Sequence, residues 1–193
     1  METLGGEDLL SWIAAYFEIA QLKQLYRQGW LRRGIPRERC ESVAEHTFGT
    51  AMLAWWLAQA YFPDLDSVRV LRLALLHDLG EVYAGDLIPE EGVPPAEKHA
   101  RELQSVQKIF AKLPEGKLYL QLWLEFEGGS TPEARFVHQV DRLEMALQAS
   151  LYEYQGYRGL QEFFDTAGAD LQGTPLDELF LAVLKSRRSD DQG

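Results

Sequence analysis

His77 and Asp78 are the residues of this sequence that point most clearly to chemistry. They follow directly on the apolar run 71–76, and burying a titratable pair there costs free energy unless something compensates it. A divalent cation does so well, because neutral imidazole and carboxylate are both good metal ligands. Adjacent helical residues lie about 100° apart, so both side chains can reach one ion. Glu81 follows one helical turn after His77 and could touch a metal-bound water or a leaving group.

The histidine–aspartate pair has a purely structural alternative, a core histidine bonded to a carboxylate at a helix end. Two further candidates favour a metal site. His46 lies just inside a predicted helix N-terminus, where the helix dipole disfavours imidazolium and keeps the ring available as a ligand. Asp141 lies on an apolar helical stripe, where a carboxylate needs a partner. The adjacent Arg142 could be that partner, so a salt bridge stays open as the alternative at this position.

Helical patterns must position these residues, because strand patterns are nearly absent from the sequence. Ser42 and Glu45 have the spacing of a capping box, and Thr131 followed by Pro132 is typical of a helix start. Apolar spacing of three and four residues favours helices elsewhere. Helices are expected over 7–27, 42–62, 68–79, 95–112, 115–126, 131–154 and 174–187, with loops at 29–41 and 85–95. The sequence therefore predicts an all-α bundle of seven or more helices.

Length and composition set the remaining expectations. With 193 residues, 46% of them hydrophobic, we expect one domain over residues 1–188 and a disordered tail at 189–193. The net charge of −11 argues against binding to a nucleic acid polymer or an anionic membrane, since both favour basic surfaces. Cys40 has no internal disulfide partner, and there is no signal-peptide pattern or membrane-spanning stretch. A cytoplasmic protein is expected.

Several blocks of the sequence together resemble the HD-domain phosphohydrolase superfamily. His46, then His77 and Asp78, then Asp141 have the order and character of its H…HD…D metal set. The neighbouring segments resemble the branch that contains the 5′-deoxynucleotidases and the HD-domain-containing protein 2 group. These segments are 22–30, 41–46, 74–81, 84–89 and 140–145. The resemblance covers roughly residues 9–187 and implies a single-domain helical bundle of the HD-domain type.

The resemblance also implies a metal centre. His46, His77, Asp78 and Asp141 would bind one divalent cation. Two neutral imidazoles and two carboxylates suit Mn, Co, Fe or Zn better than Ca, with Mg as a further candidate. Glu81 resembles the catalytic acidic residue of the family, which would orient a water or manage a proton at the leaving oxygen.

A set of substrate-binding residues is implied in the same way. Arg27 would grip the phosphate, because a guanidinium fork matches phosphate oxygens. Trp30 would pack near the sugar and could exclude a 2′-hydroxyl, although two residues separate it from Arg27, as in one of the two branches of the family. The other members of this set form a loop of Asp86, Leu87, Ile88 and Pro89. The carboxylate of Asp86 could accept a hydrogen bond from a sugar hydroxyl.

These features predict a metal-dependent phosphomonoesterase that hydrolyses 2′-deoxynucleoside 5′-monophosphates to deoxynucleoside and phosphate. One alternative is an HD phosphohydrolase of different specificity, acting on cyclic nucleotides or on another phosphoester such as guanosine tetraphosphate, although Val82 after Glu81 disfavours the last. A second alternative is a metal-binding or nucleotide-binding regulatory module without turnover, which the presence of Glu81 and Arg27 disfavours. The resemblance further implies a homodimer, and the many Trp and Tyr residues suit an interface.

Overall fold

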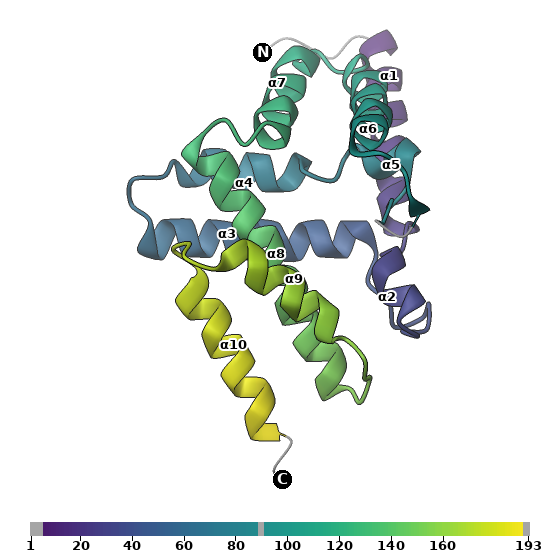
Figure 1. Cartoon of the computed structure of the whole chain (residues 1–193). Helices are drawn as coiled ribbons and strands as arrows, with labels where there is room; N and C mark the ends of the chain where they lie inside the picture. Colours follow the sequence, from purple (N-terminus) through teal and green to yellow (C-terminus); the bar gives the residue numbers. More distant parts are fainter. Residues whose placement is uncertain (1–5, 89–90, 191–193) are drawn as a thin grey trace.

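The computed structural model describes residues 6–88 and 91–190, and these residues form helices and connecting loops (Figure 1). No strand occurs among them, which confirms the predicted all-α fold. The elements are α1 (Gly6–Ile19), η1 (a 3₁₀ helix, Ala20–Lys23), α2 (Gln28–Arg32), α3 (Val43–Tyr61), α4 (Ser67–Leu76), α5 (Glu81–Ala84), α6 (Pro95–Phe110), α7 (Gly116–Glu127), α8 (Pro132–Tyr154), α9 (Gln161–Leu171) and α10 (Asp177–Asp190). None of the described helices combines the length and the apolar character needed to cross a bilayer.

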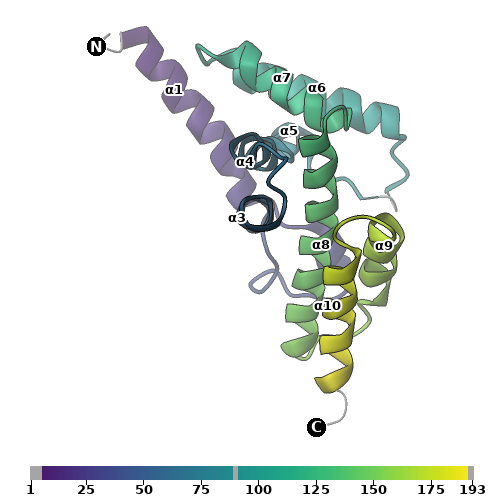
Figure 2. The ribbon, with the colours of Figure 1, turned by 90° about the vertical axis from the view of Figure 1, so that its left-hand side faces the viewer.

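The centre of the molecule is the crossing of α8 over the neighbouring helices α3 and α4 (Figures 1 and 2). One end of α8 packs against α7, which in turn contacts α6, and the other end packs against α9 and α10. On α3, the side chains that face this crossing are small: Ala51, Ala54 and Ala58 are all buried. Small side chains at three- and four-residue spacing let helices approach closely, so α3 can bring its first turn next to α8.

The start of α3 is fixed by the predicted capping box. The hydroxyl of Ser42 accepts from the backbone N–H of Glu45 (3.2 Å), and the carboxylate of Glu45 accepts from the backbone N–H of Ser42 (2.7 Å). This reciprocal pair satisfies two backbone donors that a helix N-terminus leaves free. His46 is thereby held in the first turn of α3. The start of α8 is confirmed in the same way, with Thr131 as its N-cap.

The long first helix predicted from the apolar spacing ends earlier than expected. α1 stops at Ile19, η1 continues to Lys23, and the chain then becomes extended, so that Tyr26 pairs with Ser42 in an antiparallel bridge. A bridge to a distant segment competes with local helix formation, and a periodicity of apolar residues does not report it. The short helix α2 then forms at the start of the predicted loop 29–41. The extended segment places Arg27 beside the candidate metal ligands.

Three other boundaries also differ from the sequence-based expectation. α4 ends at Leu76, three residues early, because the chain turns tightly into α5. α9 occupies a stretch for which no element was predicted. α10 continues to Asp190, so residues 189 and 190 are helical and not part of the expected tail, while residues 191–193 lie outside the described part.

Candidate active site

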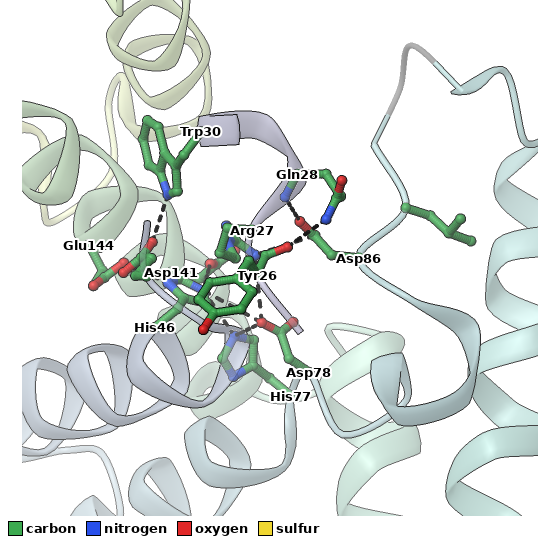
Figure 3. A network of polar contacts seen from close by, with 12 residues as sticks. Tyr26, Arg27, Gln28, Trp30, His46, His77, Asp78, Asp86, Asp141 and Glu144 are labelled. Atoms are coloured by element: carbon green, nitrogen blue, oxygen red, sulfur yellow. Dashed lines mark hydrogen bonds and ion pairs between the residues drawn. The ribbon is translucent and has the colours of Figure 1, made fainter. Parts of the chain in front are cut away.

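The four candidate metal ligands converge at the crossing of α3, α4 and α8 (Figure 3). His46 Nε2, from α3, lies 3.0 Å from Asp141 Oδ1 of α8 and 3.4 Å from His77 Nε2 at the end of α4. Asp78 Oδ2 lies 3.1 Å from His77 Nε2 and 3.6 Å from His46 Nε2. The structure therefore brings together all four residues that the sequence singled out.

The arrangement of these side chains fits a divalent cation. Asp78 Oδ2 is buried and has no hydrogen-bond partner, which is costly for a carboxylate oxygen. Each imidazole has an acceptor on its outer side: Glu144 Oε2 lies 2.6 Å from His46 Nδ1, and the Ala74 carbonyl lies 2.7 Å from His77 Nδ1. An acceptor at Nδ1 fixes a proton there, so Nε2 is the nitrogen that can give up its proton and bind a cation. Both Nε2 lone pairs then point to the centre of the cluster, where a cation could be held.

The ionised carboxylates of the cluster create a negative potential that favours a bound positive charge. Burial alone would raise the pKa of Asp78 and Asp141, but the neighbouring histidines hold the pKa of both carboxyls well below the usual range. Burial would likewise lower the pKa of His46, but hydrogen bonds to Asp141 and Glu144 raise it. Two ionised carboxylates that draw protons onto adjacent imidazoles form a site in which a cation can take the place of those protons.

Glu81 lies beside the cluster as the first residue of α5. Its backbone N–H donates to the carbonyl of Asp78 (3.0 Å), so the tight turn after α4 fixes its position. The side chain is buried, and Oε2 has no hydrogen-bond partner. Burial and the negative charges of Asp78 and Asp86 raise the pKa of Glu81 well above its usual value. A carboxyl in such surroundings can hold a proton at neutral pH and donate it to a reacting oxygen.

Arg27 provides a positive charge on the other side of Asp78. Its Nη1 lies 3.8 Å from Asp78 Oδ2 and 3.8 Å from Asp86 Oδ1. The backbone N–H of Arg27 donates to the carbonyl of Glu41 (3.1 Å), and the carboxylate of Asp86 accepts from the N–H of Gln28 at the start of α2. Asp86 thus caps α2 and holds the guanidinium near the cluster. An arginine placed in this way can bind a phosphate group.

Trp30 is fully buried, with 1% of its surface exposed. Its indole N–H donates to Glu41 Oε1 (2.7 Å). Its ring packs against those of Tyr152 and Phe163, with centroids 5.3 and 4.0 Å away. The tryptophan therefore anchors α2 to the core, and its effect on the sugar stays a prediction.

The loop after α5 carries the other predicted substrate residues. Gly85 begins it with a φ of +83°, a conformation that side chains with a Cβ rarely adopt. Leu87 and Ile88 are half-buried, and the carbonyl of Leu87 accepts from Lys98 Nζ (3.3 Å). Pro89 lies outside the described residues. The loop thus continues from the capping carboxylate of Asp86 toward α6.

Two acidic residues behind His46 received no role from the sequence. Ligand atoms of Glu41, His46 and Glu144 all lie within 4.8 Å of one another. Burial and the charge of Glu144 raise the pKa of Glu41 to about 7. Glu144 lies three residues after Asp141 on the same buried face of α8, and this spacing is the signal that could have found it.

A partly buried ion pair on α6, Lys98 with Glu102, was not predicted from the sequence. Lys98 Nζ lies 3.6 Å from Glu102 Oε1, and burial raises the pKa of Glu102 to about 7. The two residues are four positions apart on a strongly charged helix, which is also the spacing of an ordinary surface ion pair. The sequence therefore offered no signal that would separate this pair from solvent-exposed charges.

Comparisons with known proteins all point to the same family. The HD domain model matches residues 19–176. Human 5′-deoxynucleotidase HDDC2 is 35% identical over 189 residues, covering 96% of this chain and 88% of the relative. Mouse 5′-deoxynucleotidase HDDC2 is 41% identical over 155 residues, covering 78% and 75%. 5′-Deoxynucleotidase hdd1 of Schizosaccharomyces pombe is 36% identical over 153 residues, covering 75% of each chain.

Solved structures show the same similarity. A conserved hypothetical protein from Pyrococcus furiosus superposes with a TM-score of 0.75 at 29% identity, covering 92% of this chain and 99% of that protein. A protein from Magnetospirillum magnetotacticum, described as a predicted metal-dependent phosphohydrolase, superposes with a TM-score of 0.71 at 25% identity, covering 95% and 96%. The similarity therefore extends over nearly the whole chain.

Proposed function

The chain belongs to the HD domain family, and from that premise we propose that it is a metal-dependent phosphomonoesterase that hydrolyses 2′-deoxynucleoside 5′-monophosphates. The relatives named 5′-deoxynucleotidase match most of the chain. The observation that carries the proposal is the cluster of His46, His77 and Asp78, whose ligand atoms lie within 4.8 Å of one another. A half-buried arginine, Arg27, and a buried carboxyl oxygen without a partner, Glu81 Oε2, lie next to it, which is the set of groups that phosphate ester hydrolysis needs.

His46, His77, Asp78 and Asp141 would hold one divalent cation, and Mn, Co, Fe and Zn suit this mixture of nitrogen and oxygen ligands. When bound, such a cation supplies Lewis-acid charge for phosphoryl transfer and an acidified water. The unpartnered Oδ2 of Asp78 and the two facing Nε2 atoms support this assignment. The identity of the metal depends on its availability as much as on these ligands.

Arg27 and Glu81 would act on the substrate. The guanidinium of Arg27 would bind two phosphate oxygens, because its fork matches them in geometry and charge. In hydrolysis the P–O5′ bond breaks, a water oxygen joins the phosphorus, and the leaving O5′ must gain a proton. Glu81 would supply that proton, since its surroundings favour the protonated form. No described residue of this set offers a specific hydrogen-bonding pattern to a base, so we expect little preference among bases.

The sugar specificity would depend on α2 and the loop 86–88. Asp86 would lie next to the sugar while it caps α2, and Trp30 would hold α2 against the core. We expect this packing to leave little space for a 2′-hydroxyl. The wild-type protein should therefore favour deoxynucleotides over ribonucleotides by about 10-fold or more in kcat/KM, equivalent to about 1.4 kcal/mol.

The experiment measures kcat/KM for paired deoxynucleoside and ribonucleoside 5′-monophosphates of several bases with Mn²⁺ present. Trp30→Phe keeps a ring in the core, and Trp30→Ala removes it; the second change should lower the deoxy-to-ribo ratio more than the first. Equal values for both sugars in the wild type would contradict the sugar preference and leave the phosphomonoesterase in place. No phosphate release from any monophosphate would contradict both and would favour a regulatory module.

We also propose that two copies of the chain associate through α1 and α3. Both helices expose large apolar side chains, and exposed aromatic residues are typical of interfaces. The residues are Leu9, Leu10, Trp12, Ile13, Tyr16, Phe17, Phe48, Trp55 and Trp56. Light scattering should give twice the chain mass of 22.0 kDa. Trp56→Glu should yield a monomer, whereas Tyr154→Glu, at an exposed residue of α8, should not; a monomeric wild type would contradict the proposal.

A further inference from the structure

We propose that Glu144 is a positioning residue, which holds His46 in the tautomer and orientation that make its Nε2 a metal ligand. The inference rests on the proposed function, because it assumes that the cluster binds a cation. Glu144 Oε2 lies 2.6 Å from His46 Nδ1. His46 is fully buried, and 9% of the surface of Glu144 is exposed. A carboxylate–imidazole contact out of reach of bulk water is strong and directional.

This contact determines which nitrogen of the ring faces the metal site. A carboxylate accepts hydrogen bonds, so Nδ1 of His46 donates and Nε2 keeps its lone pair. Nε2 is the atom that lies 3.0 Å from Asp141 and 3.4 Å from the Nε2 of His77. The negative charge also makes the ring a stronger electron donor. His77 has only the neutral carbonyl of Ala74 in the corresponding position, so the two imidazoles are supported differently.

Gly49 makes the approach of this carboxylate possible. It lies one turn after His46 on α3, and a Cβ placed there would be 2.7 Å from Glu144 Oε1 and 3.4 Å from its Cδ. Glycine inside a helix costs about 1 kcal/mol relative to alanine, and here the missing methyl group is the space that the carboxylate occupies. Gly49→Ala should therefore displace the end of a flexible side chain, with little disturbance of the backbone.

Among the described residues, Glu144 is the hydrogen-bond partner of His46 Nδ1. Glu41 lies near the same ring, but its Oε1 already accepts from the indole N–H of Trp30 (2.7 Å). Loss of the Glu144 contact would therefore leave the ring free to turn or to change tautomer. One of the four ligands would weaken while the other three stay in place.

The experiment measures the dissociation constant of Mn²⁺ by competition with a chelator, using the full chain. Glu144→Ala and Gly49→Ala should both weaken Mn²⁺ binding, by about 10- to 100-fold, the usual scale for losing a hydrogen-bonded partner of a ligating histidine. Glu144→Gln should fall between wild type and Glu144→Ala, because its amide oxygen can still accept from Nδ1. Saturating Mn²⁺ should restore most of kcat in each variant, which a merely structural defect would not allow.

The matched control is Glu153→Gln, on the same helix and paired with Arg187 (2.7 Å); its Mn²⁺ affinity should equal that of wild type. Wild-type affinity in both Glu144→Ala and Gly49→Ala would overturn the inference. A wild type that binds no Mn²⁺ would overturn it together with the metal assignment. A wild type that binds Mn²⁺ tightly but releases no phosphate would contradict only the proposed activity, because the affinities of the variants are read without substrate.

Discussion

Asp78→Ala is expected to strip the divalent cation from the protein and to reduce phosphate release to background. Asp78 is a candidate ligand, and it lies between both histidines and the guanidinium of Arg27. Its removal takes away one of the two carboxylates that face the imidazoles and leaves Asp141 as the remaining one. Loss of several kcal/mol of charge stabilisation from the cation corresponds to a fall in kcat of about 10³-fold or more.

Elemental analysis of the purified variant and an initial-rate assay measure these two effects. Asp170→Ala removes an exposed aspartate that pairs with Arg142, and this control variant should keep both the metal and the activity. A full equivalent of tightly bound metal in Asp78→Ala would show that this ligand assignment is wrong.

The second large effect is expected for Glu81. Glu81→Ala should keep the metal and lower kcat by about 10²-fold or more, the usual scale for losing a general acid or base. The reason is that Glu81 lies beside the ligand cluster and not within it, with a buried Oε2 that has no partner. Glu81→Gln keeps the shape of the side chain and should lose nearly as much activity, because an amide cannot deliver the proton.

The metal content, kcat and KM of these two variants separate chemistry from binding. Glu97→Ala, which breaks an exposed ion pair with Arg101 on α6, is the control and should behave as wild type. A Glu81→Ala protein with near-normal kcat would remove this residue from the mechanism, whereas a protein without metal would make Glu81 part of the metal site.

Much of the fold was predictable because its signals are local. The capping box of Ser42 and Glu45 depends on residues three apart, and so does the start of α8 at Thr131. The polar residues His77 and Asp78 stand out because they end an apolar run. Patterns of this kind follow from the geometry of a single helix and need no knowledge of its neighbours.

The features that escaped prediction depend on contacts between distant segments. The bridge between Tyr26 and Ser42 ends the first helical region, although the apolar spacing there continues. Trp30 is buried because it donates to Glu41 and packs against Tyr152. A single sequence contains the residues for such contacts but does not state which segments meet, so their roles became visible only in three dimensions.

The residues that contact the candidate metal ligands from outside the cluster illustrate the same limit. The sequence places Glu144 on the face of Asp141, but it cannot show that this carboxylate contacts the outer nitrogen of His46. Nor can it show that the absence of a side chain at Gly49 leaves room for that contact. The four candidate ligands could therefore be singled out from residue types and resemblance, whereas the contact between Glu144 and His46 could not.

One measurement tests the central claim most directly: phosphate release from a deoxynucleoside 5′-monophosphate by the chelator-treated protein, before and after Mn²⁺ or Co²⁺ is added back. The cluster of His46, His77, Asp78 and Asp141 predicts no release without metal and full release once about one equivalent is bound. Undiminished release by protein shown to be free of metal, or no release at any metal concentration, would contradict the account.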